Sequence, residues 1–257
     1  MKNVITSTSN QKIKNISKCL KNAKERKKQD VFLVEGLRMF GEIPQNQHIE
    51  TFATEAFFQK HRDLFQDISY ELVSEHVLDT ITDTKTPQGV ISLVRRFHYN
   101  MEDITTGKAP LIMALENLQD PGNLGTILRT GEGAGVTGVL MSKDTVDIYN
   151  PKVVRSTMGS IFRIPFLYVE NLTRTIKDLG EQNFCTYSAH LQGKSFYDFD
   201  YTKPTIFCIG NEGNGLTDSL SAATNYKIKI PMSGKVESLN AATASTVLMY
   251  EAMRQRY

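Results

Sequence analysis

The sequence contains little cysteine, no tryptophan and no long apolar run. Its three cysteines, Cys19, Cys185 and Cys208, form no CxxC pair, which excludes a disulfide scaffold and a cysteine-rich zinc site and fits a reducing compartment. Apolar runs of about 18 residues are absent, so the sequence predicts no membrane-spanning helix. Because the first residues also lack the apolar core of a signal peptide, we expect a cytoplasmic protein with no membrane partner.

The histidines and the composition exclude further classes. The five histidines are scattered without the spacing of metal ligands, so we predict no metal site. A length of 257 residues corresponds to one large or two modest domains. With 40% hydrophobic and 23% charged residues, the chain has a globular composition rather than that of a disordered or collagen-like protein.

Positive charge is concentrated at the start of the chain. Residues 1–30 hold nine Lys or Arg residues and two acidic ones, a net charge of +7, so the rest of the chain carries −5 of the total of +2. Residues 10–28 have apolar positions at helical spacing, with Asn10 as the expected N-cap. The lysines between these positions form either a solvated helix face or a contact with a polyanion.

Two α/β segments are separated by a polar stretch. Residues 1–97 alternate short apolar runs with helical patterns, including a strand at 31–34 and a helix at 37–43. Residues 98–109 are polar and contain a turn signal, so we expect a linker there. A terminal helix is expected at 239–255, after five strand candidates: Leu111–Leu115, Val139–Met141, Phe184–Ala189, Thr205–Ile209 and Tyr226–Ile230. This alternation predicts an α/β fold with a mostly parallel sheet and helices on both faces.

Three loops rich in glycine or small residues carry the functional signal. The first, 116–138, contains six glycines, and its GxGxxG spacing ends a helix and precedes a strand. A dinucleotide-binding fingerprint has the reverse context, which excludes a nicotinamide-dependent dehydrogenase. The second loop, 209–216, and the third, 230–240, each follow a strand. Ligands in open α/β sheets bind beyond the carboxyl ends of strands.

In this order the loops resemble the motifs of the SpoU (TrmH-like) branch of the SPOUT RNA 2′-O-ribose methyltransferases. The matching residues are Asn123-x-Gly125-x-x-x-Arg129, Gly210-Asn211-Glu212-Gly213-x-Gly215-Leu216, and Ile230-Pro231-Met232 followed by Ser238-Leu239-Asn240. The resemblance covers residues 109–257. More loosely, Phe32-Leu33-Val34-Glu35-Gly36 with Arg38 resembles the family's N-terminal substrate-binding domain, which is similar to ribosomal protein L30e.

The resemblance implies S-adenosyl-L-methionine as cofactor, bound in a deep trefoil knot of the C-terminal segment. It divides the chain into an L30e-like RNA substrate-binding domain (1–97), a linker (98–109) and a knotted methyltransferase domain (110–257). The implied cofactor contacts are Ser188, Ala189, His190, Gly210, Ile230 and Leu239. The implied catalytic group comprises Arg129, Asn123, Glu212, Ser238 and Asn240. We expect RNA contacts from Lys21, Lys24, Lys27, Lys28 and Arg38.

The motif residues have alternative interpretations. Arg129 matches the family's catalytic residue, but a guanidinium pKa above about 12 makes it a poor base, so we expect it to anchor a phosphate and stabilise the developing alkoxide. Its alternative is an intrahelical pair with Glu132. Ser238 either positions the acceptor or caps the terminal helix. Glu212 would organise Arg129 or the third loop, and the two motif asparagines would orient the ribose or fix loop geometry.

The expected substrate is RNA, and a separate N-terminal domain favours 23S rRNA, because tRNA-modifying relatives often have only short extensions. A tRNA methyltransferase is the alternative within the family. The competing class is a non-catalytic RNA-binding or ribosome-assembly factor on the same fold. It would explain the basic start, but it gives no reason for the motif residues to occur together.

The terminal helix carries two apolar stripes. One comprises Leu239, Ala242, Thr246, Met249 and Met253, and the other comprises Ala241, Ala244, Leu248 and Ala252. If one stripe covers the sheet of the monomer, the other is an apolar surface that predicts a partner. Family members dimerise through this helix, so we expect a homodimer through the C-terminal domain. The alternative is that both stripes are buried within one subunit.

Overall fold

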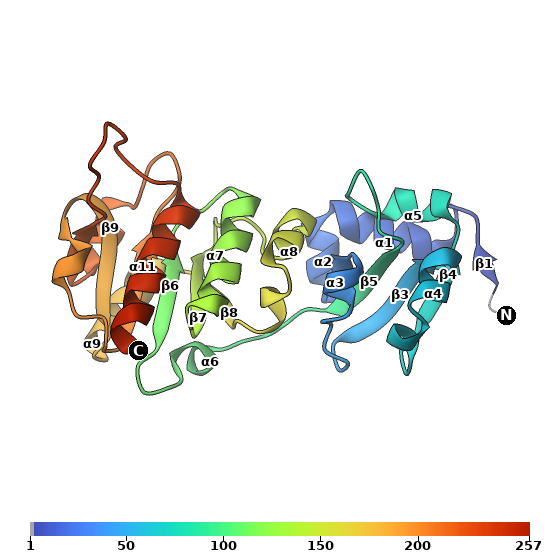
Figure 1. The fold of residues 1–257 in the computed structure, drawn as a ribbon, viewed down its shortest axis with the longest axis horizontal. Helices are drawn as coiled ribbons and strands as arrows, with labels where there is room; N and C mark the ends of the chain where they lie inside the picture. Colours follow the sequence, from blue (N-terminus) through green and yellow to red (C-terminus); the bar gives the residue numbers. More distant parts are fainter. Residues whose placement is uncertain (1–2) are drawn as a thin grey trace. The chain divides into compact units, whose positions relative to one another are not determined.

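The computed structural model describes residues 3–257, which form two compact units (Figure 1). One unit comprises the chain up to His98 together with Asp147–Phe162, and the other comprises Tyr99–Val146 and Arg163–Tyr257. The predicted division differs from this one in the segment 147–162, which lies in the first unit. Within residues 3–257, no helix has the length and apolar character needed to cross a membrane.

The first unit is built on a five-stranded mixed sheet in the order β1-β4-β3-β5-β2. Its strands are β1 (Val4–Ile5), β2 (Val31–Glu35), β3 (His48–Thr54), β4 (Tyr70–Val73) and β5 (Val90–Arg95). Its helices are α1 (Gln11–Lys21), α2 (Ala23–Gln29), α3 (Leu37–Phe40), α4 (Glu55–Lys60), η1 (Arg62–Phe65), α5 (Glu75–Ile81), α8 (Pro151–Thr157) and η2 (Ser160–Phe162). Ile13 and Ile16 of α1 and Ile81 of α5 are buried with Leu33 and Phe52 of the sheet, which makes one core.

The helix predicted at 10–28 is two helices, because Asn22 interrupts it. The backbone of Asn22 is extended, and its side chain accepts a hydrogen bond from the Lys24 N–H at 2.9 Å. Asn22 therefore ends α1 and caps α2, as asparagine does when it competes with helical backbone bonds. Asn10 caps α1, accepting from the Lys12 N–H at 2.9 Å, which confirms the expected start.

The second unit is built on a six-stranded sheet in the order β11-β9-β10-β6-β7-β8, in which all neighbouring strands are parallel. Its strands are β6 (Leu111–Leu115), β7 (Gly138–Ser142), β8 (Phe166–Val169), β9 (Cys185–Ser195), β10 (Thr205–Ile209) and β11 (Tyr226–Lys229). Its helices are α6 (Met101–Thr105), α7 (Pro121–Gly133), α9 (Leu172–Glu181), η3 (Phe196–Asp198), α10 (Asp218–Ala223) and α11 (Ala241–Arg256). The predicted parallel α/β architecture is confirmed.

Helices cover both faces of this sheet. Side chains alternate along a strand, and Ile112, Ala114, Ile206 and Cys208 share a core with α9 and α10. The intervening residues of β6 and β10 face the other way, where α11 contacts both strands and packs on α7. Figure 1 shows α7 and α11 side by side over this face. The fully buried strands fit a parallel sheet covered on both sides.

Two segments differ from the sequence-based expectation. Within the predicted linker, α6 begins with a capping box at Asn100, and its Ile104 is fully buried beneath β7. A Cβ on Gly138 would lie only 2.6 Å from the Ile104 side chain, so this glycine allows the contact. Strand β8, at the edge of the sheet, was not predicted. A four-residue apolar run after a proline is too short to distinguish from a loop.

Both apolar stripes of α11 are largely buried within the subunit. Met249 of the first stripe has no exposed surface and packs toward Gly131 of α7, where Thr246 is hydrogen-bonded to Thr130 at 3.3 Å. Leu248 of the second stripe is also buried, as are Ala241 and Ala252. The expectation that one stripe is left exposed is wrong, because α11 packs both on α7 and on β6 and β10 of the sheet.

Candidate active site

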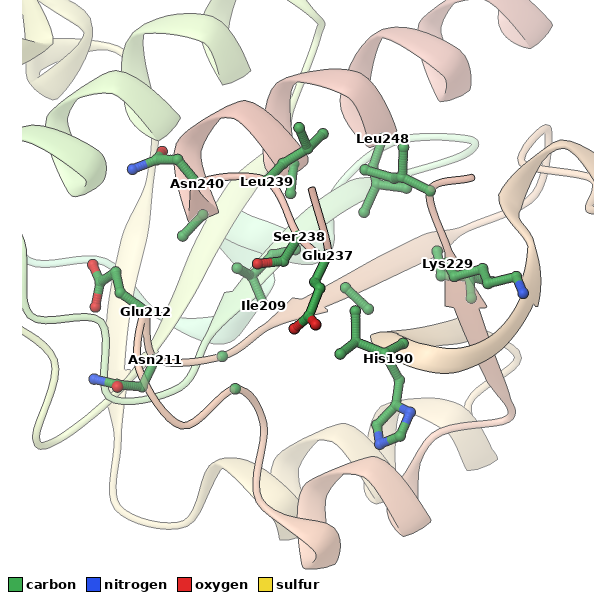
Figure 2. Close-up of a pocket in the computed structure, with 18 of the residues that line it drawn as sticks. His190, Ile209, Asn211, Glu212, Lys229, Glu237, Ser238, Leu239, Asn240 and Leu248 are labelled. Atoms are coloured by element: carbon green, nitrogen blue, oxygen red, sulfur yellow. The ribbon is translucent and has the colours of Figure 1, made fainter. Parts of the chain in front are cut away.

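A pocket of about 570 Å³ lies at the carboxyl ends of β9, β10 and β11 (Figure 2). Parallel strands end at one edge of their sheet, so the second and third motif loops, which follow the strands on either side of β9, both reach this edge and line the pocket. The first turns of α11 complete the lining with Ala241, Ala244 and Leu248. Burial of Leu248 and Ile209 makes the floor apolar.

The pocket brings together five of the six residues assigned to the cofactor. Its lining includes Ala189, His190, Gly210, Ile230 and Leu239. Ser188 is not among the lining residues. It is fully buried, and its hydroxyl is hydrogen-bonded to the Thr224 hydroxyl at 3.0 Å. Because side chains alternate along β9, Ser188 and Ala189 point to opposite faces, which the sequence motif alone does not show.

Strand β9 carries a bulge at the rim of the pocket. Ser188 is in register with Lys227 of β11, but the next pair is Lys194 with Ile228, so residues 189–193 have no partner in β11. We call residues 189–193 the β9 bulge. It supplies Ala189, His190 and Leu191 to the pocket, and Leu191 is 66% exposed. The bulge explains why β9 extends beyond its predicted end.

The second motif is a tight turn that requires its glycines. Asn211 and Gly215 exchange two backbone hydrogen bonds, at 3.0 and 2.9 Å. A Cβ on Gly210 would lie 2.1 Å from the carbonyl carbon of Gly215, so no other residue fits at position 210. The φ angle of Gly215 is +69°, in the region that favours glycine. The turn therefore brings its backbone close to the pocket, which Asn211, Glu212 and Asn214 of the same turn also line.

A chain of hydrogen bonds links the three motifs. The Asn123 side-chain amide donates to Glu212 Oε1 at 3.0 Å, and the Asn240 amide donates to Asn123 Oδ1 at 2.9 Å. Glu212 also accepts from the backbone N–H groups of Gln119 and Asp120, at 3.2 and 3.1 Å. Asn123 is therefore the bridge that fixes the second and third loops to the start of α7.

Hydrogen bonding keeps Glu212 ionised. Partial burial raises the pKa of its carboxyl. The hydrogen bonds from Asn123 and from backbone N–H groups together lower the pKa by more than burial raises it, so the pKa lies below its ordinary value. These donors occupy Glu212, and it makes no bond to Arg129. Of the two roles considered for Glu212, the structure supports organisation of the loops.

Arg129 is exposed on α7 and makes no hydrogen bond or ion pair within residues 3–257. The alternative of a pair with Glu132 is wrong, because Glu132 is bound by Arg163, whose Nη2 lies 3.1 Å from Glu132 Oε2. Arg163 is distant in the sequence, so no local pattern indicated it. Arg129 does not line the pocket and is free to meet a ligand outside it.

Ser238 lines the pocket and is exposed to solvent. It does not cap α11, because the N-cap is Asn240, whose Oδ1 accepts from the N–H groups of Ala242 and Thr243 at 2.8 and 3.3 Å. Asn240 thus uses its oxygen for the helix and its amide for Asn123. The interpretation of Ser238 as a cap is wrong.

Residues outside the assigned set also shape the site. Glu116, at the end of β6, is buried and accepts from the Thr217 N–H and hydroxyl at 2.7 and 2.8 Å, which holds the chain after the second motif. Asn211 and Glu237 line the pocket. Both lie inside the motif loops, and this position in the sequence could have identified them as pocket residues. Within residues 3–257, His, Cys, Asp and Glu form no group of three arranged to hold a metal ion.

The lysines assigned to RNA lie on the first unit. Lys21, Lys24, Lys27 and Lys28 are all exposed, and Arg38 is exposed with only a 3.6 Å contact to Glu42. Arg26 differs from its neighbours: it is buried, donates to the Cys19 carbonyl at 2.8 Å and pairs with Asp147. Lys2, another residue of the basic start, lies outside the described residues.

Family models match both parts of the chain. Residues 110–250 match the SpoU rRNA Methylase family, and residues 10–92 match the MRM3-like substrate binding domain. The chain is 32% identical over 248 residues to the Bacillus subtilis 23S rRNA (guanosine(2553)-2′-O)-methyltransferase RlmP, covering 96% of this chain and 97% of that protein.

Solved structures resemble the whole chain or only part of it. The SpoU methyltransferase AviRb of Streptomyces viridochromogenes, in complex with AdoMet, superposes with a TM-score of 0.86 at 27% identity, covering 96% of this chain and 98% of its own. The A. aeolicus TrmH/SpoU tRNA modifying enzyme covers 59% of this chain and 77% of its own, with a TM-score of 0.52 at 28% identity. With the motif loops joined at one pocket and the family model matched over 110–250, the chain belongs to the SpoU rRNA methylase family.

Proposed function

We propose that this protein transfers a methyl group from S-adenosylmethionine to a ribose 2′-hydroxyl of 23S rRNA, in the cytoplasm. The observation that carries the proposal is the bridge from Glu212 through Asn123 to Asn240, which joins all three motifs at one pocket. The family and the full-length similarity to a 23S rRNA 2′-O-methyltransferase support it.

The pocket fits the cofactor in size and chemistry. Its volume lies within the range of about 300–1,000 Å³ typical of small-ligand sites. Ile230, Leu239 and Leu248 offer apolar surface for an adenine ring, and the tight turn at Gly210 allows close approach of backbone groups. When bound there, the cofactor supplies a methyl group activated by its sulfonium.

The residues of the chain position the acceptor. Ser238 lies in the pocket wall, where it can orient the ribose, and Asn123 and Asn240 hold that wall in place. Arg129 anchors an RNA phosphate and stabilises the alkoxide as the proton leaves to phosphate or water, because a guanidinium does not act as a base near neutral pH. The roles of Glu212 and the asparagines are thus to preorganise the site.

We assign RNA binding to residues 1–97, joined by 98–109 to a methyltransferase domain at 110–257. The match of residues 10–92 to a substrate-binding domain supports this assignment. It also favours rRNA over tRNA, because a tRNA-modifying relative of known structure, the A. aeolicus enzyme, covers only 59% of the chain. We also infer the trefoil knot in the C-terminal segment, which family membership and the close backbone packing at Gly210 support.

Replacing Lys21, Lys24, Lys27 and Lys28 by glutamine is expected to weaken RNA binding and flatten its salt dependence. Each lost phosphate contact lowers the slope of log affinity against log salt by about one. Titration of an rRNA fragment at several salt concentrations measures the slope. Lys12→Gln is the control, because carboxylates of Glu50 and Glu71 already hold the Lys12 ammonium. If the slope is unchanged in the variant with all four substitutions, these lysines form a solvated helix face and do not contact RNA phosphates.

We propose a homodimer formed through α11. Burial of both stripes removes the argument from exposed apolar surface, so the proposal rests on family resemblance and on Tyr250, which remains 45% exposed on this helix. Sedimentation at micromolar concentration is expected to give about twice the monomer mass of 28.9 kDa. A single species at the monomer mass would contradict the dimer.

Methyl transfer with purified components tests the function. Wild-type protein, labelled S-adenosylmethionine and 23S rRNA should yield a labelled 2′-O-methylnucleoside after digestion, and tRNA should yield none. Label in tRNA alone would favour the tRNA methyltransferase alternative. RNA binding without transfer to any RNA would favour the assembly factor, whose fold would be the same.

A further inference from the structure

Glu237 places an uncompensated carboxylate in the pocket. It lies in the loop between β11 and α11, and Figure 2 shows its carboxylate directed into the space lined by Ser238 and Ile209. Unlike Glu212, which accepts from Asn123 and two backbone N–H groups, Glu237 has no hydrogen bond or ion pair within residues 3–257. Its charge is therefore available to a ligand.

The basic side chains that line the pocket do not neutralise Glu237. They are His190 and Lys229, and Figure 2 shows both directed away from it. The ring nitrogen Nδ1 of His190 accepts from the Gln192 N–H at 3.1 Å, within the β9 bulge. Glu212 is a second carboxylate in the lining. Because the side chains of His190 and Lys229 are not directed at Glu237, the charge in this part of the pocket favours a positively charged ligand.

The methyl donor and its by-product differ in charge. S-adenosylmethionine carries a sulfonium and an ammonium against one carboxylate, so its net charge is +1. In transfer, the carbon–sulfur bond breaks as the ribose oxygen forms a bond to the methyl carbon. The sulfur keeps the electron pair and becomes a neutral thioether, and the 2′-hydroxyl loses its proton. The by-product, S-adenosylhomocysteine, therefore has a net charge of zero.

We propose that Glu237 is the residue that selects the charged methyl donor over its neutral by-product. The inference rests on the proposed function and deepens it. The carboxylate attracts the donor before transfer, and the attraction falls when the sulfonium becomes a thioether, which favours release of the by-product. A carboxylate beside the sulfonium would contribute in this way because charge pairs near a protein surface are worth more than in bulk water.

Calorimetric titration of both ligands into wild type and Glu237→Gln tests the inference. The dissociation constant of S-adenosylmethionine is expected to rise about tenfold in the variant, and that of S-adenosylhomocysteine to change by less than about twofold. Lys235→Gln is the matched control, because Lys235 is exposed in the same loop and does not line the pocket. The control should bind both ligands like wild type.

Other outcomes separate this inference from the proposed function. Equal weakening of both ligands by Glu237→Gln would overturn it and assign Glu237 to loop structure. Unchanged binding of both, with transfer lost, would also overturn it and indicate a proton acceptor. If wild type binds neither ligand, the proposed function itself fails. If wild type binds both ligands and Glu237→Gln leaves the ratio of their dissociation constants unchanged, only the role of Glu237 is rejected and the proposed function stands.

Discussion

Replacing Arg129 by alanine is expected to lower the rate of methyl transfer by a factor of about 100 or more, while S-adenosylmethionine binding stays near the wild-type value. The reason is geometric. Arg129 is exposed, has no partner within residues 3–257 and does not line the pocket, so its guanidinium is assigned to RNA and to the transition state rather than to the cofactor. Single-turnover transfer rates and calorimetry measure the two quantities separately.

Two further variants define this effect. Arg129→Lys should also fail, because a point charge does not reproduce the planar, bidentate guanidinium. Arg174→Ala is the control, since Arg174 is an 80% exposed arginine on α9 with only a 3.6 Å contact to Asp178. It should keep wild-type turnover. An Arg129→Ala protein that retains most of its turnover would remove Arg129 from the mechanism.

Replacing Asn123 by alanine is expected to weaken cofactor binding at least about tenfold and to lower the free energy of unfolding by about 1–3 kcal/mol. Asn123 is only 8% exposed and joins Glu212 to Asn240. Its loss leaves the Asn240 amide without its acceptor and Glu212 with backbone donors alone. The third loop, which forms part of the pocket, is then no longer fixed. Calorimetry and urea unfolding measure the two changes.

The control for Asn123 is a variant with a similar loss of stability outside the site. Asn150 caps α8 in the first unit, accepting from the Lys152 N–H at 2.9 Å, and loss of such a cap costs about 1 kcal/mol. Asn150→Ala should therefore lower the free energy of unfolding without lowering the affinity for the cofactor. Asn123→Asp should bind more weakly than Asn123→Ala, because a second carboxylate would face Glu212. If Asn123→Ala binds the cofactor as tightly as wild type, the hydrogen-bonded bridge through Asn123 does not hold the pocket in its binding form.

Much of the fold follows from periodicity, because a fully buried parallel strand has a clear apolar run. The bounds of β6 and β10 agree with the predicted strands, and the loops that follow β10 and β11 meet at the pocket because parallel strands end at one edge. Their polar residues also indicated the site. Local sequence therefore selected five residues that the structure brings together at one pocket.

The remaining differences arise from partners that are distant in sequence or from the phase of a strand. Arg163 takes Glu132 away from Arg129, although the local spacing favoured an intrahelical pair. Ser188 does not reach the pocket because it is the last residue paired with β11 before the β9 bulge, and its hydroxyl is hydrogen-bonded to Thr224 instead. The burial of α11 depends on its packing against α7, and the sequence of α11 alone does not indicate that contact. Each of these features is set by tertiary packing.

The decisive measurement is the mapping of ribose 2′-O-methylation at nucleotide resolution in rRNA and tRNA from cells with and without this gene. We expect one 2′-O-methyl mark in 23S rRNA to be absent without the gene and to return with the wild-type gene, but not with the gene for Arg129→Ala. An identical set of marks in both cells, or a lost mark confined to tRNA, would contradict it.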